Sequence, residues 1–154
     1  MQLWQWMPPL SHLKMSMKIS SEEDSQTSNA RLVRVLRVYE TDEIIVGFGS
    51  IVLSCFGFGE ATSDDVGHDL WASFSVMEID DFRIWRLDDD TPDAIKRIDG
   101  SWSYEIHGTL HGSNVHACGL VIGDEESPIS PEYDYLDGAR VGTIVDRLDI
   151  TFHR

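Results

Sequence analysis

Apolar and polar residues alternate along short runs in most of this chain after residue 30. The clearest run begins at Trp102, where Trp102, Tyr104, Ile106 and Leu110 alternate with polar side chains. Successive side chains of a β-strand point to opposite faces, so a period of two gives a strand with one buried face. The pattern predicts a mainly β protein.

Further runs have the β-branched and aromatic content of strands. They lie at residues 31–38, 43–58, 70–77, 82–87, 115–122 and 141–152. The run at 31–38 also suits a helix, because its arginines recur at three-residue spacing. Gly47 and Gly49 predict a bend, a bulge or the turn of a tight hairpin within the run at 43–58.

One short helix is expected near residues 92–98. The signals for its start are an N-cap at Thr91 or Asp90, Pro92 at the first helical position and Asp93 at the positive end of the helix dipole. Asp99 and Gly100 end it after about two turns.

These elements predict a mainly β fold: a single-domain antiparallel β-sandwich or a strongly curved sheet, with one short helix. We expect the all-β domain at residues 31–154. Residues 1–30 are expected to be a flexible N-terminal tail and linker, since its second half is largely polar.

The aromatic residues Trp4 and Trp6 leave two explanations for this tail. It is either a peptide arm that uses them as anchors, since aromatic side chains suit contact surfaces, or a stretch upstream of a true start at Met15 or Met17.

Charge narrows the kinds of partner. The chain has 27 Asp+Glu against 12 Lys+Arg, a formal net charge of −15 over 154 residues. Because 42% of its residues are hydrophobic, it has the apolar surface to fold, which acidic disordered chains lack. Such a protein attracts basic partners and repels nucleic acid and anionic membranes.

The two cysteines, Cys55 and Cys118, make no disulfide framework and are expected to be small buried side chains. No apolar stretch approaches the ~20 residues of a membrane span. The first residues lack the basic start of a signal peptide. The sequence therefore predicts a reduced, cytoplasmic protein.

The segment 105–118 gathers side-chain types that bind metals. They are Glu105, His107, His111, His116 and Cys118. With a two-residue hairpin loop His107 pairs with Cys118 and all five side chains share one face. With a three-residue loop His116 and Cys118 move to the opposite face and the cluster dissolves.

Signatures of catalysis are missing from the sequence. Ser50 follows a glycine without the Gly-x-Ser-x-Gly elbow, and the Gly-Phe-Gly segments at 47–49 and 57–59 lack the lysine of a phosphate-binding loop. Pro92 and Ala94 break the spacing of a calcium loop after Asp88. We therefore expect a protein that is not an enzyme and has no cofactor.

Carboxylates concentrate at residues 60–69, 78–93 and 124–137. Such loops can serve solubility alone, or they can steer a basic protein while aromatic neighbours anchor it. The predicted partner-binding residues are Asp64, Asp65, Asp88, Asp89, Asp90, Glu132, Tyr133, Asp134, Tyr135 and Asp137. Trp85 is a further candidate anchor, whereas Trp102 is predicted to lie in the core.

Several stretches form a recognisable pattern: a strand pair at 31–58, Phe74-Ser-Val-Met-Glu-Ile-Asp-Asp-Phe-Arg-Ile84 and the terminal Asp146-Arg-Leu-Asp-Ile-Thr-Phe152. In this pattern the chain resembles the small acidic immunity proteins of bacterial polymorphic toxin systems. The resemblance implies neutralisation of a cognate toxin, often a nuclease, by covering its active site or a nearby surface. Small phage-encoded inhibitors of bacterial defence share the same size and acidity.

The leading hypothesis is an acidic protein that binds and neutralises a basic partner protein, such as a toxin or nuclease, as an immunity protein or inhibitor. No direct contact with nucleic acid or membrane is expected. The alternative is a metal- or small-ligand-binding β module centred on the 105–118 hairpin, with His107, His111, His116 and Cys118 as ligands.

Overall fold

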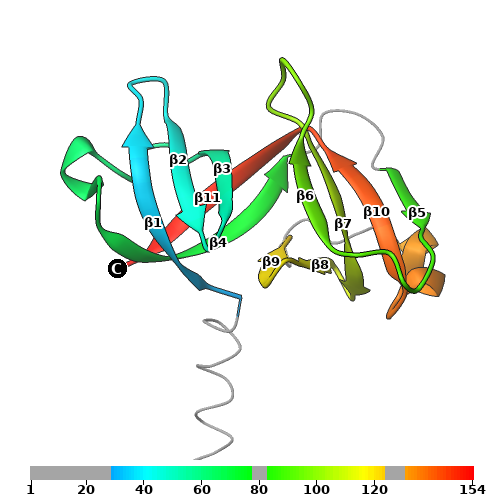
Figure 1. Cartoon of the computed structure of the whole chain (residues 1–154). Helices are drawn as coiled ribbons and strands as arrows, with labels where there is room; N and C mark the ends of the chain where they lie inside the picture. Colours follow the sequence, from blue (N-terminus) through cyan, green and yellow to red (C-terminus); the bar gives the residue numbers. More distant parts are fainter. Residues whose placement is uncertain (1–28, 78–82, 124–130) are drawn as a thin grey trace, which may run out of the picture.

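The computed structural model describes residues 29–77, 83–123 and 131–154, which form strands and short 3-10 helices (Figure 1). The strands are β1 (Arg31–Val38), β2 (Glu43–Phe48), β3 (Ile51–Phe56), β4 (Asp69–Met77), β5 (Arg83–Arg86), β6 (Ala94–Arg97), β7 (Tyr104–His111), β8 (Asn114–Ala117), β9 (Leu120–Ile122), β10 (Arg140–Val145) and β11 (Arg147–His153). The 3-10 helices are η2 (Ser63–Asp65) and η3 (Pro131–Leu136). The predicted mainly β fold is confirmed.

Strands β1, β2, β3, β11 and β4 close into a barrel in that order, because β4 pairs back with β1. The pairing between β3 and β11 is parallel, and the other pairs of the barrel are antiparallel. This is the strand order of the OB-fold, a five-stranded Greek-key barrel. The predicted antiparallel sandwich or strongly curved sheet is therefore a closed five-stranded barrel with further strands, and its pairs β3–β11 and β4–β9 are parallel.

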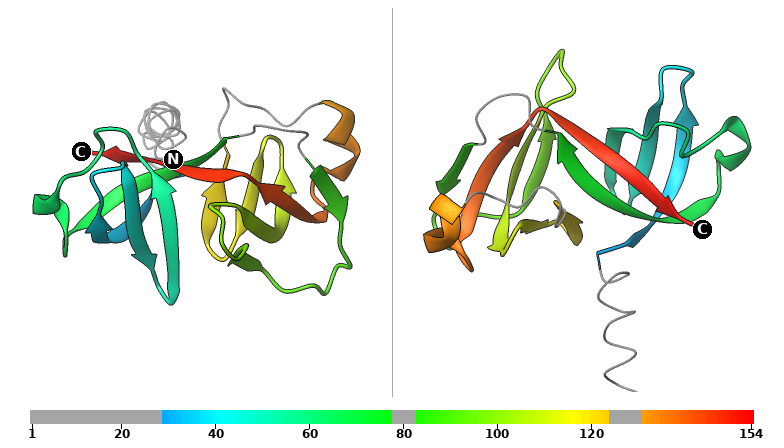
Figure 2. Two further views of the ribbon diagram at one scale, coloured as in Figure 1. Left: turned by 90° about the horizontal axis from the view of Figure 1, so that it is seen from above. Right: turned by 180° about the vertical axis from the view of Figure 1, so that it is seen from behind.

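The chain between β4 and β11 builds a second group of strands, which we call the inserted lobe (described residues 83–123 and 131–146). Strand β7 is its centre, with β10 on one side and both β6 and β8 on the other. Strand β5 pairs with β10, and β9 returns to β4. The long strands β4 and β11 run from the barrel toward this lobe (Figure 2).

Tyr104 joins the inserted lobe to the barrel. The backbone N–H of Ser54 in β3 donates a hydrogen bond of 2.8 Å to the Tyr104 hydroxyl, which is buried. Strand β3 pairs with β11 only at Phe56, so the Ser54 amide has no strand partner on that side. The phenol supplies the missing acceptor, and its burial raises the pKa of Tyr104.

The core follows the predicted alternation. Its residues include Val33 and Val35 of β1, Ile106 and Leu110 of β7, and Leu148, Ile150 and Phe152 of β11. Gly49, just after β2, lies in the predicted hairpin turn at a φ of 58° that favours glycine, whereas Gly47 lies within β2 and pairs with Val52.

The helix predicted near residues 92–98 is wrong. Ala94–Arg97 is strand β6, paired antiparallel with the first half of β7. Asp93 does not start a helix, because its carboxylate binds Arg140 at 2.6 Å and accepts the Cys118 N–H at 2.8 Å. An open strand edge at β7 outweighs the local helix signals, which are weak over so short a segment.

Trp102 is not in the core, contrary to the prediction. Strand β7 begins only at Tyr104, so Trp102 lies in the preceding turn and is 51% exposed. Its ring meets Phe56 edge to face at 5.0 Å between centroids. Cys55 is buried as predicted, whereas Cys118 is only half-buried, in the turn after β8 at a φ of 54°.

Candidate partner-binding site

The 3-10 helix η3 presents Tyr135 to solvent. Residues three apart share a face of a 3-10 helix, and accordingly Tyr133 and Leu136 both pack toward the core. Tyr135 lies on another face and is 76% exposed. Its neighbour Asp134 is also exposed. The buried Leu136 and the partly buried Tyr133 hold the backbone of η3 against the core, and the exposed Tyr135 side chain projects from it.

Asp137 ties this turn to the β7–β8 hairpin. Its Oδ1 accepts a hydrogen bond of 2.9 Å from the backbone N–H of Gly112. The next residue, Gly138, donates its N–H to the Leu110 carbonyl at 2.7 Å. The backbone of Asp137 is therefore held, while its side chain stays at the surface.

A second acidic segment follows β5. Asp88, Asp89 and Asp90 are all exposed, and the Thr91 N–H closes their turn by donating to the Asp88 carbonyl at 3.0 Å. In the described part of the chain no Lys, Arg or His nitrogen lies within 4 Å of these three carboxylates. A shallow hollow of about 310 Å³ lies over Arg86 and the first two aspartates.

Arg140, the first residue of β10, holds the two acidic segments together. Its carbonyl accepts the Leu87 N–H at 2.8 Å. Its guanidinium donates to the Thr91 carbonyl at 2.6 Å, to the Asp93 carboxylate at 2.6 Å and to the Thr109 hydroxyl at 3.0 Å. Since η3 leads directly into β10, both segments flank the same strand end (Figure 2).

We call this set of exposed side chains the acidic end. It consists of Asp88, Asp89, Asp90, Asp134, Tyr135 and Asp137. Arg140 is already paired with Asp93, whereas the exposed Arg86 lies beside Asp88 and Asp89 and offsets part of their charge. The other carboxylates leave this end net negative, and a negative potential attracts cationic side chains.

Other predicted contact residues lie elsewhere. Asp64 and Asp65 belong to η2 on the barrel, at the opposite end of the molecule from η3 (Figure 1). Asp65 binds Arg154 at 3.0 Å and accepts the Thr62 N–H, and these hydrogen bonds hold its pKa below the usual value. The Asp65 carboxylate therefore links η2 to the C-terminal residue Arg154.

The structure places the remaining residues of this region as follows. Tyr133 is partly buried and packs against the core. Glu132 is part of η3, but its side chain is not among those the structure describes, and residues 124–130 of the predicted acidic loop also lie outside the described residues. Trp85 is half-buried, and its indole lies against Gly142, where an added Cβ would meet the ring at 2.5 Å.

The alternative metal set does not converge. The predicted two-residue loop is present, with Thr109 opposite His116, but β8 ends at Ala117. Strand β6 then takes the place beside β7, so His107 faces Ala94 instead of Cys118. Among the described residues no group of three or more His, Cys, Asp or Glu is arranged to hold a metal ion.

What remains of that set is a pair of histidines. The rings of His111 and His116 meet nearly at right angles, 4.6 Å apart between centroids. Partial burial, together with His111 and Arg31, lowers the pKa of His116. His107 lies 3.6 Å from Glu105, its neighbour on the same face of β7.

Sequence reasoning missed Arg140 as the residue that assembles the site. Its partners at Thr91, Asp93 and Thr109 are distant in sequence, and no local pattern links them. An arginine directly after a long acidic loop was the only available signal.

Among the described residues no helix is long and apolar enough to cross a membrane. Comparison with curated proteins gave no match, and neither did comparison with solved structures. A family model does match, over residues 28–153, and so spans both the barrel and the inserted lobe. The chain therefore belongs to the family described as uncharacterised conserved protein UCP019853.

Proposed function

We propose that this protein binds a basic partner protein through the acidic end. The observation that carries the proposal is Tyr135, a 76% exposed aromatic side chain in a turn whose Asp134 and Asp137 are also exposed. A surface that only keeps a protein in solution needs charge but has no need of an exposed phenol beside its carboxylates. An exposed tyrosine on an ordered turn is typical of an interface anchor.

In this proposal the carboxylates and the phenol have different roles. The exposed aspartates speed the encounter with a cationic surface and orient it. The exposed carboxylates of Asp88 and Asp89 accept hydrogen bonds from a lysine or arginine side chain of the partner. Tyr135 packs on the partner once water is expelled, and this slows dissociation.

Such binding neutralises a partner whose cationic surface works on phosphates. Lysines and arginines that hold a nucleic-acid backbone are the groups that the acidic end would cover. A nuclease toxin or another nucleic-acid-binding protein is therefore the proposed partner class, in the manner of an immunity protein or an inhibitor. The net charge of −15 opposes direct contact with nucleic acid or an anionic membrane.

The test is affinity capture from a lysate of the native host, with the full chain as bait, followed by binding measurements on the protein recovered. We expect one basic protein that is released as salt rises, since salt screens exposed charges. The variants Tyr135→Ala and Asp88→Asn/Asp89→Asn should each lose most of the capture.

Asp64→Asn is the matched control, because it removes an exposed carboxylate at the other end of the molecule. It should leave capture unchanged. Equal loss with Asp64→Asn, or full capture by Tyr135→Ala, would contradict the assignment of the contact to the acidic end.

A further inference from the structure

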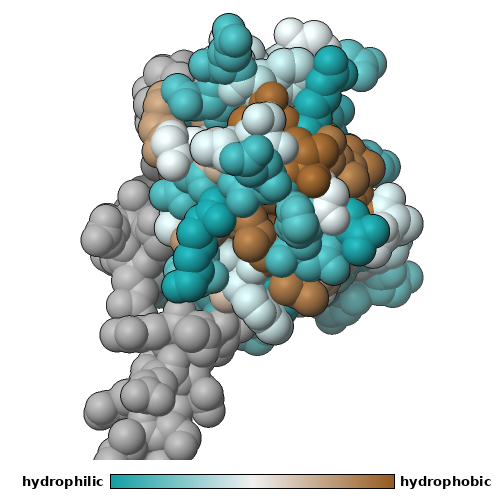
Figure 3. Space-filling view, turned by 90° about the vertical axis from the view of Figure 1, so that its left-hand side faces the viewer, coloured by the Kyte–Doolittle hydropathy of each residue, from teal (hydrophilic) through white to brown (hydrophobic). Residues whose placement is uncertain are grey.

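The barrel exposes apolar side chains on one side. We call the set Leu32, Leu36, Val52 and Trp71 the barrel face; they come from β1, β3 and β4. Val52 is 62% exposed and Trp71 is 53% exposed. Figure 3, which views the molecule from its barrel side, shows apolar residues at the surface among hydrophilic ones.

Strand register puts these residues on the same side of the sheet. Leu32 lies opposite Trp71, and Arg34 lies opposite both Asp69 and Gly47. Paired residues in a sheet project from the same face. Gly47 in turn lies opposite Val52, so the face continues across four neighbouring strands.

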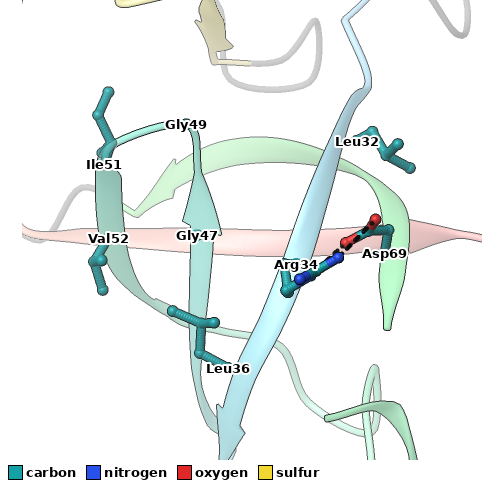
Figure 4. A pocket seen from close by; sticks show the side chains of 8 residues that line it. All are labelled: Leu32, Arg34, Leu36, Gly47, Gly49, Ile51, Val52 and Asp69. Carbon is teal, nitrogen blue, oxygen red and sulfur yellow. Dashed lines mark hydrogen bonds and ion pairs between the residues drawn. The ribbon is translucent and has the colours of Figure 1, made fainter. Parts of the chain in front are cut away.

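The centre of the face is hollow on one side and raised on the other. Gly47 has no side chain, and a shallow groove of about 370 Å³ lies above it between Leu36 and Val52 (Figure 4). A Cβ at Gly47 would point into this groove, 3.4 Å from the Leu36 side chain. On the other side of β1, Trp71 projects toward solvent.

An exposed ion pair lines the hollow on the side of β1 and β4. Arg34 Nε binds Asp69 Oδ1 at 2.9 Å, and a second bond joins Nη2 to Oδ2 at 3.3 Å. The pair raises the pKa of Arg34 and lowers that of Asp69. Both side chains remain open to solvent, so the same groups can also meet charges on another molecule.

We propose that the barrel face binds a second copy of this chain in a two-fold symmetric dimer. A two-fold contact uses the same patch on both subunits, so the patch must be complementary to itself. An axis beside Arg34 brings each Arg34 to the partner's Asp69. The same rotation lays the exposed apolar side chains of β1 and β4 of one copy against those of the other.

The distribution of charge favours the barrel face over the acidic loops as the contact with a second copy. Each copy carries −15, so close approach through the acidic loops is repulsive. The lining of the groove has one arginine and one aspartate, already paired, and is locally neutral. Arg37 lies on the same strand and pairs with Ile45, two residues before Gly47 on the same face of β2. Two copies can therefore pack here with less repulsion than through the acidic loops.

The proposal is independent of the acidic end, which lies on the inserted lobe. The two contacts also respond to salt in opposite directions. Capture of a basic partner weakens as salt rises, whereas salt screens the repulsion between two acidic copies and favours the dimer. Failure of one proposal therefore leaves the other standing.

The test is sedimentation of the purified full chain over a concentration series, at low and moderate salt. We expect a monomer–dimer equilibrium that shifts toward dimer as salt rises. Val52→Asp and Trp71→Asp should each raise the dimer dissociation constant by about tenfold or more, as burial of a charge at an interface centre does.

Tyr135→Asp is the control, since it puts the same charge on an exposed aromatic position far from the barrel face; it should leave the equilibrium unchanged. Arg34→Asp alone should weaken the dimer, and Arg34→Asp/Asp69→Arg should restore it. A chain that sediments as a monomer up to about 1 mM overturns the proposal. So does a dimer that Val52→Asp and Trp71→Asp both leave intact.

Discussion

Single residues decide how the acidic end is assembled, and Arg140 is the clearest case. Its side chain is 18% exposed and binds groups from the loop after β5, from the residue before β6 and from β7. Because the guanidinium presents several donors in one plane, one residue can satisfy three acceptors on two segments, the β5–β6 connection and β7. No lysine could replace it, since an ammonium lacks that fork.

We predict that Arg140→Met lowers the free energy of unfolding by about 2–4 kcal/mol, because it strips Asp93 and Thr91 of a partly buried partner. Urea denaturation at neutral pH measures the change. Arg34→Met, which removes an exposed ion pair, is the control and should cost much less. Equal losses in the two variants would mean that Arg140 is no more than a surface charge.

A second prediction contrasts two strand glycines. A Cβ on Gly108 would lie 2.3 Å from the His116 carbonyl oxygen, so the β7–β8 backbone must shift to admit it. We expect Gly108→Ala to cost about 1–3 kcal/mol of stability. Gly47→Ala meets only the end of the Leu36 side chain, at 3.4 Å, and should cost less than about 1 kcal/mol. Thermal unfolding of both variants measures the two losses, and an equal loss at the two positions would contradict the prediction.

At the scale of elements, the sequence predicted the strands better than their partners. Local alternation identifies β7 and β11, because one buried face demands it. The segment 94–97 was predicted as helix because only pairing with β7 makes it a strand. The acidic loops were found by composition, but their meeting around Arg140 depends on non-local contacts that no window of sequence contains.

The joint between barrel and inserted lobe gives a third prediction. Tyr104→Phe removes the acceptor for the Ser54 N–H and should cost about 1–2 kcal/mol. The Ser54 amide should then exchange its hydrogen faster than in the unmodified chain. Tyr135→Phe, which alters an exposed hydroxyl, should change neither quantity.

The contact between η2 and the C-terminus gives a fourth, tested by pH. The ordinary pKa of Asp65 is 3.8, and its hydrogen bond with Arg154 lowers the pKa in the folded state. A lowered carboxyl pKa adds stability above the ordinary value, and that stability is lost as pH falls through the folded value. Arg154→Gln should therefore lose stability at about pH 7, and its deficit against the unmodified chain should narrow as pH falls toward about 2. The part that remains in acid reflects the loss of the Arg154 bond to the Glu60 carbonyl, which no carboxylate titration removes. A deficit that does not narrow in acid would contradict this linkage.

Across the whole molecule, the two surfaces lie on different units, the acidic end on the inserted lobe and the barrel face on the barrel. The barrel closure was beyond sequence reasoning, because it rests on the pairs β1–β4 and β3–β11, whose members are far apart in the chain. The net charge, in contrast, is plain in the sequence and bears on both proposed contacts.

A fifth prediction concerns the rate of partner binding. Asp134→Asn/Asp137→Asn removes charge, while the amide oxygen introduced by the second substitution can still accept the Gly112 N–H. We expect slower association with little change in dissociation, since exposed charge acts mainly on encounter. Stopped-flow or biosensor kinetics with the captured partner measure both rates. Faster dissociation at an unchanged association rate would contradict it.

The pairing of β4 with β11 has a consequence for how this architecture can change. Met77 and Arg147 face each other across the two strands, so the inserted lobe leaves and re-enters the barrel at neighbouring points. The inserted lobe is thus an insertion between β4 and β11, and the strand order of the barrel does not include its strands. A different insertion could join the barrel at the same two points, provided that it supplies a hydroxyl or carbonyl to accept the Ser54 N–H. The surface that carries the proposed contact could then change while the barrel keeps its strand order.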